Sequence, residues 1–279
     1  MTGGFAGSGG ETPSGGLPAA AVGVLLTADA AAKASAAQAV AAAWRAGRLT
    51  LDPGPPPPDR PARPAQPVLR PPQEVPRRRI GTGAPGRFAL LHALAHIELN
   101  AIDLAWDVLA RFGEPGLPRG FFDDWVRVAD EEARHFLLLQ QRLAALGGRY
   151  GDLDAHDGLW QAAQATADDL LARLAVVPLV LEARGLDVTP GMIERLQAVG
   201  DQDSAAVLDV IYREEIGHVA VGRRWFDWLC GRRGCAPHES WQSLVRARFR
   251  GRLKPPFNEA ARAAAGLPAD WYLGAARDA

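Results

Sequence analysis

The sequence predicts an all-α protein built around a four-helix bundle, and two observations support this class. Two Glu-x-x-His motifs, which begin at Glu132 and Glu215, each follow a lone Glu at an otherwise apolar position. The lone residues, Glu98 and Glu182, precede the motif glutamates by 34 and 33 residues, which predicts that the chain contains two similar helical hairpins. Two packed hairpins form a four-helix bundle, in which such motifs point inward.

The part of the chain before the bundle divides into two segments. Residues 1–50 have a Gly/Ser-rich start, which predicts disorder, followed by an Ala-rich stretch that predicts one or two small helices. Residues 51–79 are rich in proline, which is incompatible with helix or sheet interiors. We therefore expect an extended, proline-rich arm of polyproline II type across the surface.

Residues 80–232 are expected to form the bundle itself. The first helix is predicted at 87–112, where an apolar stripe of helical period includes Glu98. The second is predicted at 119–146, after a turn rich in Gly and Pro, and its apolar stripe carries the first Glu-x-x-His motif. Both helices should therefore direct an acid into the core.

The second hairpin follows a long connection over 147–156. A third helix is predicted at 157–184, with Glu182 near its end and a bend at Pro178, because proline disrupts a helix interior. Residues 185–200 are predicted to form a turn and a short helix with a proline near its start.

The fourth bundle helix is predicted at 203–230 and carries the second Glu-x-x-His motif on its inner face. Residues 233–279 are expected to form a helical extension that packs on the bundle. All four bundle helices would thus direct a carboxylate inward.

The spacing of the inward residues predicts a two-metal site. Residues three apart share a helix face, so a Glu and a His at this spacing can hold one ion together. Four carboxylates in one core would repel each other, and Arg134 and Arg213 fall on other helix faces, so divalent cations are the simplest neutraliser. The expected metal ligands are Glu98, Glu132, His135, Glu182, Glu215 and His218.

Four segments carry a resemblance to a known family: His-Ile-Glu-Leu at 96–99, Asp-Glu-Glu-Ala-Arg-His-Phe at 130–136, Val-Leu-Glu-Ala-Arg-Gly-Leu-Asp at 180–187 and Arg-Glu-Glu-Ile-Gly-His at 213–218. They resemble an uncharacterised bacterial ferritin-like family of the domain-of-unknown-function type. This family lies within the ferritin-like superfamily of di-iron carboxylate proteins. The resemblance covers most of the chain and implies a fold and a metal site without a known substrate.

The resemblance implies a division of the ligands between two metal ions. One ion would be held by Glu98, Glu132 and His135, and the other by Glu182, Glu215 and His218. In this arrangement Glu132 and Glu215 would bridge the ions. The ions would be two Fe, two Mn or a mixed Fe/Mn pair, because carboxylate-rich sites accept both metals.

Three further residues are candidates for roles beside the metals. Glu131 and Glu214 each lie one turn before a motif His and could orient an imidazole by accepting its free N–H; the alternative is a solvated acid on the helix flank. Tyr212 lies one turn before Glu215 and is the candidate catalytic residue, as a source of a proton or an electron. Its alternative is a core aromatic side chain with a hydrogen-bonded hydroxyl.

The first functional hypothesis is an oxidoreductase or oxygenase that uses O2 or peroxide on a small organic substrate. The second is metal handling, as a ferroxidase, a peroxide-detoxifying protein or a storage protein. The third is a non-catalytic, metal-stabilised protein that binds a partner. The sequence contains no flavin or iron–sulfur motif, so an external electron donor is implied if turnover consumes electrons.

Charge and hydropathy argue against two classes of partner. The formal net charge is −1, which does not favour nucleic-acid binding. A basic, apolar leader and an apolar run of membrane-spanning length are not evident in the sequence, so we expect neither export nor membrane insertion. A cytoplasmic location is the resulting expectation.

Overall fold

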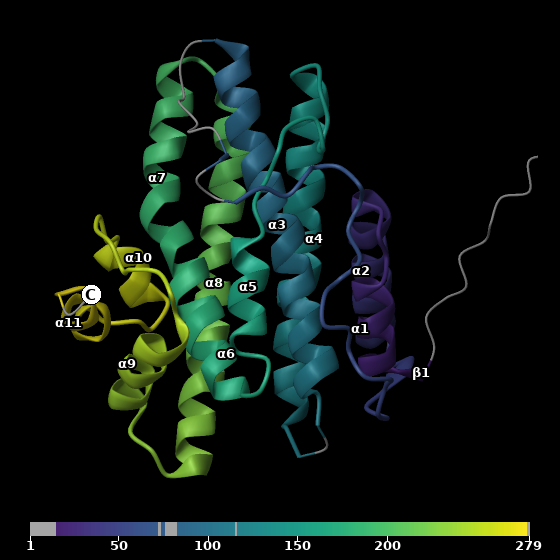
Figure 1. Ribbon diagram of the computed structural model, residues 1–279, viewed down its shortest axis with the longest axis vertical. Helices are drawn as coiled ribbons and strands as arrows, with labels where there is room; N and C mark the ends of the chain where they lie inside the picture. Colours follow the sequence, from purple (N-terminus) through teal and green to yellow (C-terminus); the bar gives the residue numbers. More distant parts are fainter. Residues whose placement is uncertain (1–14, 72–73, 76–82, 115, 278–279) are drawn as a thin grey trace, which may run out of the picture.

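The computed structural model describes residues 15–71, 74–75, 83–114 and 116–277 (Figure 1). The predicted disordered start, residues 1–14, lies outside these ranges, as do residues 72–73 and 76–79 of the predicted arm. The described chain is mostly helical, which confirms the all-α class. Its strands are the two-residue segments β1, Gly15–Gly16, and β2, Leu49–Thr50, which pair in parallel.

The first predicted hairpin is present as two long helices. Helix α3, Ala84–Phe112, and helix α4, Arg119–Ala145, pack along each other. They confirm the helices predicted at 87–112 and 119–146 to within three residues at each end. The apolar stripes identified in the sequence therefore face a common core.

Helix α8, Gln202–Arg233, corresponds to the helix predicted at 203–230. It begins where the carboxylate of Asp201 accepts a hydrogen bond from the backbone N–H of Ser204 at 3.1 Å, which is a helix N-cap. It ends at Gly234, whose φ of 65° is in the left-handed region that glycine adopts at low cost. Helix α8 packs against α4 and so joins the two halves of the structure.

The helix predicted at 157–184 begins within one residue of the predicted start, but the prediction is wrong about its continuity and about its C-terminal end. The structure has a short helix, then a break, then a nearly continuous helical segment that runs well beyond residue 184. Its parts are α5, Gly158–Gln164; α6, Leu170–Val176; the π-helix η1, Val177–Glu182; and α7, Ala183–Ala198.

Asp169 explains the break. Its carboxylate accepts the backbone N–H of Leu171 at 3.0 Å and starts a new helix. The next turn carries Arg173, whose guanidinium is fully buried and pairs with Asp107 of α3. Burial of this ion pair fixes α6 against α3.

Pro190 explains the error at the C-terminal end of the predicted helix. The sequence suggested that it opens a short helix, but it lies inside α7. A proline has no N–H for the carbonyl four residues earlier, here that of Leu186. The side-chain amide of Asn258 donates to that carbonyl at 3.1 Å instead. A residue distant in sequence thus replaces the lost helical hydrogen bond, and α7 continues.

The π-helix η1 lies at the bend that Pro178 was expected to cause. This segment crosses α8 at very short range. A Cβ atom on Gly222 of α8 would lie 2.3 Å from the Cβ of Pro178, so the contact requires glycine. The wider turn of η1 ends at Glu182, one of the predicted ligands. π-Helical turns often occur at functional sites.

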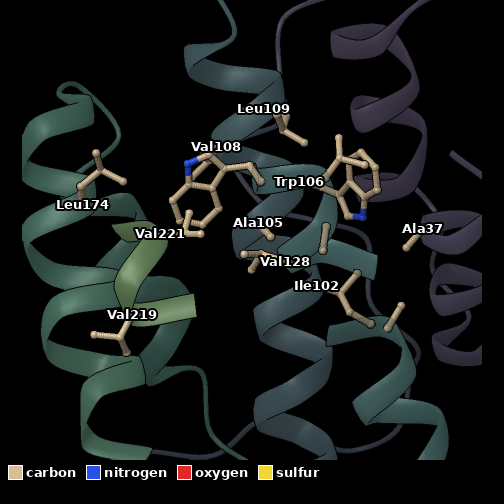
Figure 2. Packing of buried hydrophobic residues seen from close by; sticks show 14 of the residues in the cluster. Ala37, Ile102, Ala105, Trp106, Val108, Leu109, Val128, Leu174, Val219 and Val221 are labelled. Atoms are coloured by element: carbon tan, nitrogen blue, oxygen red, sulfur yellow. The ribbon is translucent and has the colours of Figure 1, made fainter. Parts of the chain in front are cut away.

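Apolar side chains from all the long helices fill the core (Figure 2). Trp106 and Ile102 of α3 are fully buried, as are Val219 and Val221 of α8. Helix α3 is the one described helix with the length and apolar character of a membrane span, with a mean hydropathy of 1.3. Because 72% of the most apolar stretch of α3 is buried inside the protein, packing in the core accounts for the hydropathy of this helix.

The N-terminal segments cover the outer face of the first hairpin. Helix α1, Leu17–Leu25, packs on α3, and helix α2, Ala30–Arg45, packs on α4. The described arm, residues 51–71, then crosses the surface without helix. Lys33 of α2 and Arg63 of the arm both pair with the buried Asp103 of α3. These pairs hold the arm against the bundle.

Residues after α8 form three further helices on the opposite side (Figure 1). They are α9, Pro237–Arg248; α10, Glu259–Ala264; and α11, Ala269–Arg277. The buried guanidinium of Arg262 in α10 binds Asp187 of α7 at 2.7 Å. This pair fixes the C-terminal segment to the second hairpin.

Candidate metal centre

The six predicted ligands converge on one region between the long helices. Glu98 comes from α3, and Glu182 is the last residue of η1. Helices α4 and α8 each supply one Glu-x-x-His motif. One ligand atom from each of four residues lies within 4.8 Å of the others; these are Glu98, Glu132, His135 and Glu215.

Glu132 occupies the middle of the cluster. Its Oε2 lies 3.3 Å from Nδ1 of His135, and its Oε1 lies 2.9 Å from Nδ1 of His218. The same nitrogen of His135 is 3.3 Å from Oε2 of Glu98, and that of His218 is 3.6 Å from Oε1 of Glu215. A single carboxylate therefore touches the imidazoles of both motifs.

Several buried atoms of the cluster lack a hydrogen-bond partner among the described residues. Glu132 Oε1 and His218 Nδ1 are close, but their orientation does not form a hydrogen bond, and both are unsatisfied. Oε2 of Glu182 and Oε2 of Glu215 are unsatisfied too. Buried polar atoms are rarely left without partners. Their convergence is the arrangement expected of ligands for a shared cation.

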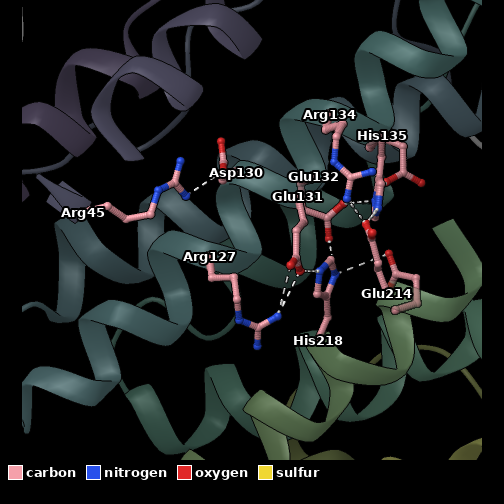
Figure 3. Close-up of polar contacts among 11 residues, drawn as sticks. Arg45, Arg127, Asp130, Glu131, Glu132, Arg134, His135, Glu214 and His218 are labelled. Atoms are coloured by element: carbon pink, nitrogen blue, oxygen red, sulfur yellow. Dashed lines mark hydrogen bonds and ion pairs between the residues drawn. The ribbon is translucent and has the colours of Figure 1, made fainter. Parts of the chain in front are cut away.

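The far side of each imidazole is held by a carboxylate from the other motif helix (Figure 3). Nε2 of His135 donates to Glu214 of α8 at 2.7 Å, and Nε2 of His218 donates to Glu131 of α4 at 2.8 Å. These bonds fix the rings and direct both Nδ1 atoms to the cluster. The sequence identified both acids by their position one turn before a motif His, but the imidazole that each accepts from belongs to the other motif helix, so the partners are exchanged.

Two arginines support these carboxylates. Arg127 binds Glu131 at 3.0 Å, and Arg134 pairs with Glu214. Both arginines lie on α4, outside the apolar stripe. Because Arg134 does not lie on the apolar stripe, the sequence pattern gave it no role at the site. The signal for Arg127 is its position one turn before Glu131 on the same helix.

The electrostatics of the cluster keep both imidazoles protonated when no cation is present. Burial alone would lower the pKa of His135 and His218, but the surrounding carboxylates raise it well above the ordinary value of 6.5. Burial would raise the pKa of Glu132, yet the charge of His218 and the hydrogen bond and charge of His135 hold it well below its ordinary value.

The remaining ligand acids shift the other way. Burial is the main cause that raises the pKa of Glu98, Glu182 and Glu215, and the neighbouring Glu132 carboxylate raises each of them further. A divalent cation would relieve both effects, because it neutralises the acids and replaces their protons.

A cavity of about 290 Å³ opens onto the cluster between α3 and α7. All four ligand glutamates line it, and its other walls are mainly apolar. Glu182 is only partly buried, and the side chain of Glu215 is 12% exposed, which the opening of this cavity explains. The centre is therefore deep in the protein but reachable from outside.

The sequence that forms this fold and cluster matches a known protein family. Residues 26–273 match the model of a family described as "Protein of unknown function (DUF455)". The match covers nearly the whole chain, including every residue of the cluster.

The chain belongs to this DUF455 family.

This DUF455 member is 46% identical over 184 residues to an uncharacterized protein of Haemophilus influenzae. The alignment covers 64% of each chain, so it spans less than two thirds of that relative. No solved structure matches the chain.

Tyr212 of this family member lies away from the cavity. Its hydroxyl accepts a hydrogen bond from the amide of Asn258 at 2.9 Å, and its ring packs partly buried against the core. It is not among the residues that line the cavity. This environment favours the alternative stated for it, an aromatic residue with a satisfied hydroxyl.

Raising the pH is expected to strengthen cation binding by the cluster. A cation must displace the protons of His135 and His218, so its affinity increases with pH. The metal-free protein should lose stability above pH 6.5, because the folded state then holds more protons than the unfolded state. Melting temperatures with and without Mn(II), at about pH 6 and about pH 8, test this. An equal increase in melting temperature on addition of Mn(II) at both pH values would contradict this prediction.

Proposed function

We propose that this protein is a ferritin-like, dinuclear iron or manganese protein that uses O2 or peroxide to oxidise an organic substrate. The observation that carries the proposal is the convergence of four carboxylates and two imidazoles, from four helical segments, beside one apolar cavity. This donor set is the one that ferritin-like dinuclear centres use.

The residues fit a pair of divalent cations. The unsatisfied oxygens of Glu132, Glu182 and Glu215 and the nitrogen of His218 are the atoms that cations would bind. Glu132, whose two oxygens lie near both imidazoles, would help to hold both ions. When bound, a pair of iron or manganese ions supplies two-electron redox chemistry with O2 or peroxide.

The side chains of the protein have distinct tasks in this scheme. Glu131 and Glu214 accept the Nε2 protons of the opposite imidazoles and so keep both Nδ1 atoms available as ligands. The imidazoles that they bind, followed by Arg127 and Arg134, hold the pKa of these two acids below the ordinary value. The apolar wall of the cavity excludes water and holds a substrate near the carboxylates.

The cavity favours oxidation of a substrate over metal storage. A storage or ferroxidase protein needs a path along which ions reach the centre, and polar or charged groups that line such a path replace the water lost by the ion. Here the access route is walled by side chains such as Leu94, Val188 and Met192. An apolar route beside a metal centre suits an organic molecule better than an aqueous ion.

Metal content is the test of the proposed centre. Protein loaded anaerobically with Fe(II) or Mn(II) and then desalted is expected to hold about two ions per chain by inductively coupled plasma mass spectrometry. Subsequent consumption of O2 or peroxide should then be measured. Many iron ions per chain would favour storage, whereas protein that binds neither metal would refute the proposal.

A further inference from the structure

The cavity beside the glutamates is elongated along the bundle. On α3 its wall runs from Leu94 to Leu104, a length of about 15 Å at the usual rise per residue. Glu98 lies between these two ends, and Glu182 lies within the lining stretch of η1 and α7, so these two carboxylates meet the cavity along its length. A ligand that fills it would lie along α3 with its middle against the centre.

The wall has little to offer a polar ligand. Beyond the four glutamates, the one charged side chain among the described lining residues is Arg184. Its Nη1 already donates to the carbonyls of Lys254 at 2.7 Å and Pro256 at 3.0 Å. A ligand with many polar groups would lose hydration here without gaining partners, and that loss weakens binding. An apolar chain has no polar groups whose hydration would be lost in this cavity.

The cavity also has an apolar entrance. Ile97 lines it and is 41% exposed, which is unusual for a large aliphatic side chain in this structure. Val188 and Met192 of α7 face it from the other side and are only partly buried. An apolar molecule can therefore reach the cavity between α3 and α7.

We propose that the cavity binds the hydrocarbon chain of an aliphatic substrate and holds the middle of that chain against the carboxylates. A cavity of about 150 Å³ accommodates benzene, so the present volume corresponds to a chain of about ten to twelve carbon atoms. The inference that this chain is the molecule oxidised rests on the proposed function. The binding itself does not require the metals.

Gly185 allows a sharp test. It lines the cavity, and a Cβ built there meets nothing within 4 Å, so Gly185→Leu should introduce a side chain at the cavity wall without a clash at its Cβ. Gly231 of α8 has equally open surroundings outside the cavity, and Gly231→Leu is the matched control. Val188→Phe, which narrows the same cavity from another position, is a second variant should Gly185→Leu fold poorly.

The measurement is calorimetric titration of 1-decanol into the full-length, metal-free protein. The wild type and Gly231→Leu should bind it equally, and Gly185→Leu or Val188→Phe should weaken binding by about tenfold or more. Adenosine, a polar molecule of similar size, should not bind. Absence of decanol binding to the wild type, equal binding by the cavity variants, or equal affinity for adenosine would each overturn the proposal.

These outcomes separate the two proposals. Protein that binds two metals per chain but no decanol would overturn the hydrocarbon site and leave the dinuclear centre standing. Protein that binds decanol but neither Fe(II) nor Mn(II) would overturn the dinuclear centre and leave the hydrocarbon site standing.

Discussion

Replacing Glu132 with Ala is expected to abolish metal binding and to reduce the free energy of unfolding of the metal-free protein by about 3–5 kcal/mol. This carboxylate lies within 3.3 Å of one imidazole and 2.9 Å of the other, and its depressed pKa keeps it ionised between them. Without it, two buried imidazoles either remain charged with fewer carboxylates beside them or lose protons that the fold otherwise stabilises. Both outcomes are costly.

The experiment combines metal analysis with denaturant unfolding monitored by circular dichroism. Glu132→Gln keeps the shape and removes the charge, so it separates electrostatic loss from the loss of packed volume. Glu194→Ala, which changes an exposed residue of α7, is the control and should retain the wild-type metal content and stability. Wild-type metal content in folded Glu132→Ala would refute its assignment as a ligand.

Replacing Gly222 with Ala is expected to lower stability by about 1–3 kcal/mol and to reduce metal content from two ions towards one. The added Cβ would lie 2.3 Å from the rigid ring of Pro178, so η1 must move away from α8. Glu182 ends that π-helix and moves with it, whereas the ligands on α3 and α4 do not. One half of the centre should therefore suffer selectively.

Pro178→Gly removes the atoms that the new methyl group would meet, so the double variant should recover metal content relative to Gly222→Ala alone. Gly231→Ala on the same helix meets no neighbour and should stabilise the protein by up to about 1 kcal/mol. If Gly222→Ala is as stable and as fully loaded as the wild type, the close crossing of η1 and α8 does not position Glu182.

The parts of the fold that the sequence predicted are those set by local pattern. Helices α3, α4 and α8 have unbroken apolar periodicity and recognisable ends, and the motif spacing placed their acids on inward faces. The break in the third helix and its C-terminal limit were missed because they depend on distant partners. Asn258 satisfies the carbonyl that Pro190 leaves without an N–H, and local rules contain no information about residue 258.

The candidate site shows the same division. The convergence of the six candidate ligand residues followed from spacing, since a helix fixes which residues share a face. The cavity did not, because it depends on how far apart α3 and α7 lie. The exchanged partners of His135 and His218 were missed for a related reason. A one-turn spacing indicates that an acid is near its own helix's imidazole, but the packing of α4 on α8 decides which imidazole it meets.

The exchange of Glu131 and Glu214 has a consequence for how such a centre can be divided. Each hairpin carries a full Glu and Glu-x-x-His set, yet the acid that orients its imidazole belongs to the other hairpin. A single hairpin, expressed alone, would hold its ligands with a freely turning ring and a poor affinity for metal. Two copies of one hairpin would restore the missing acids by symmetry. The candidate centre therefore needs both hairpins, and one hairpin alone lacks the acid that orients its imidazole.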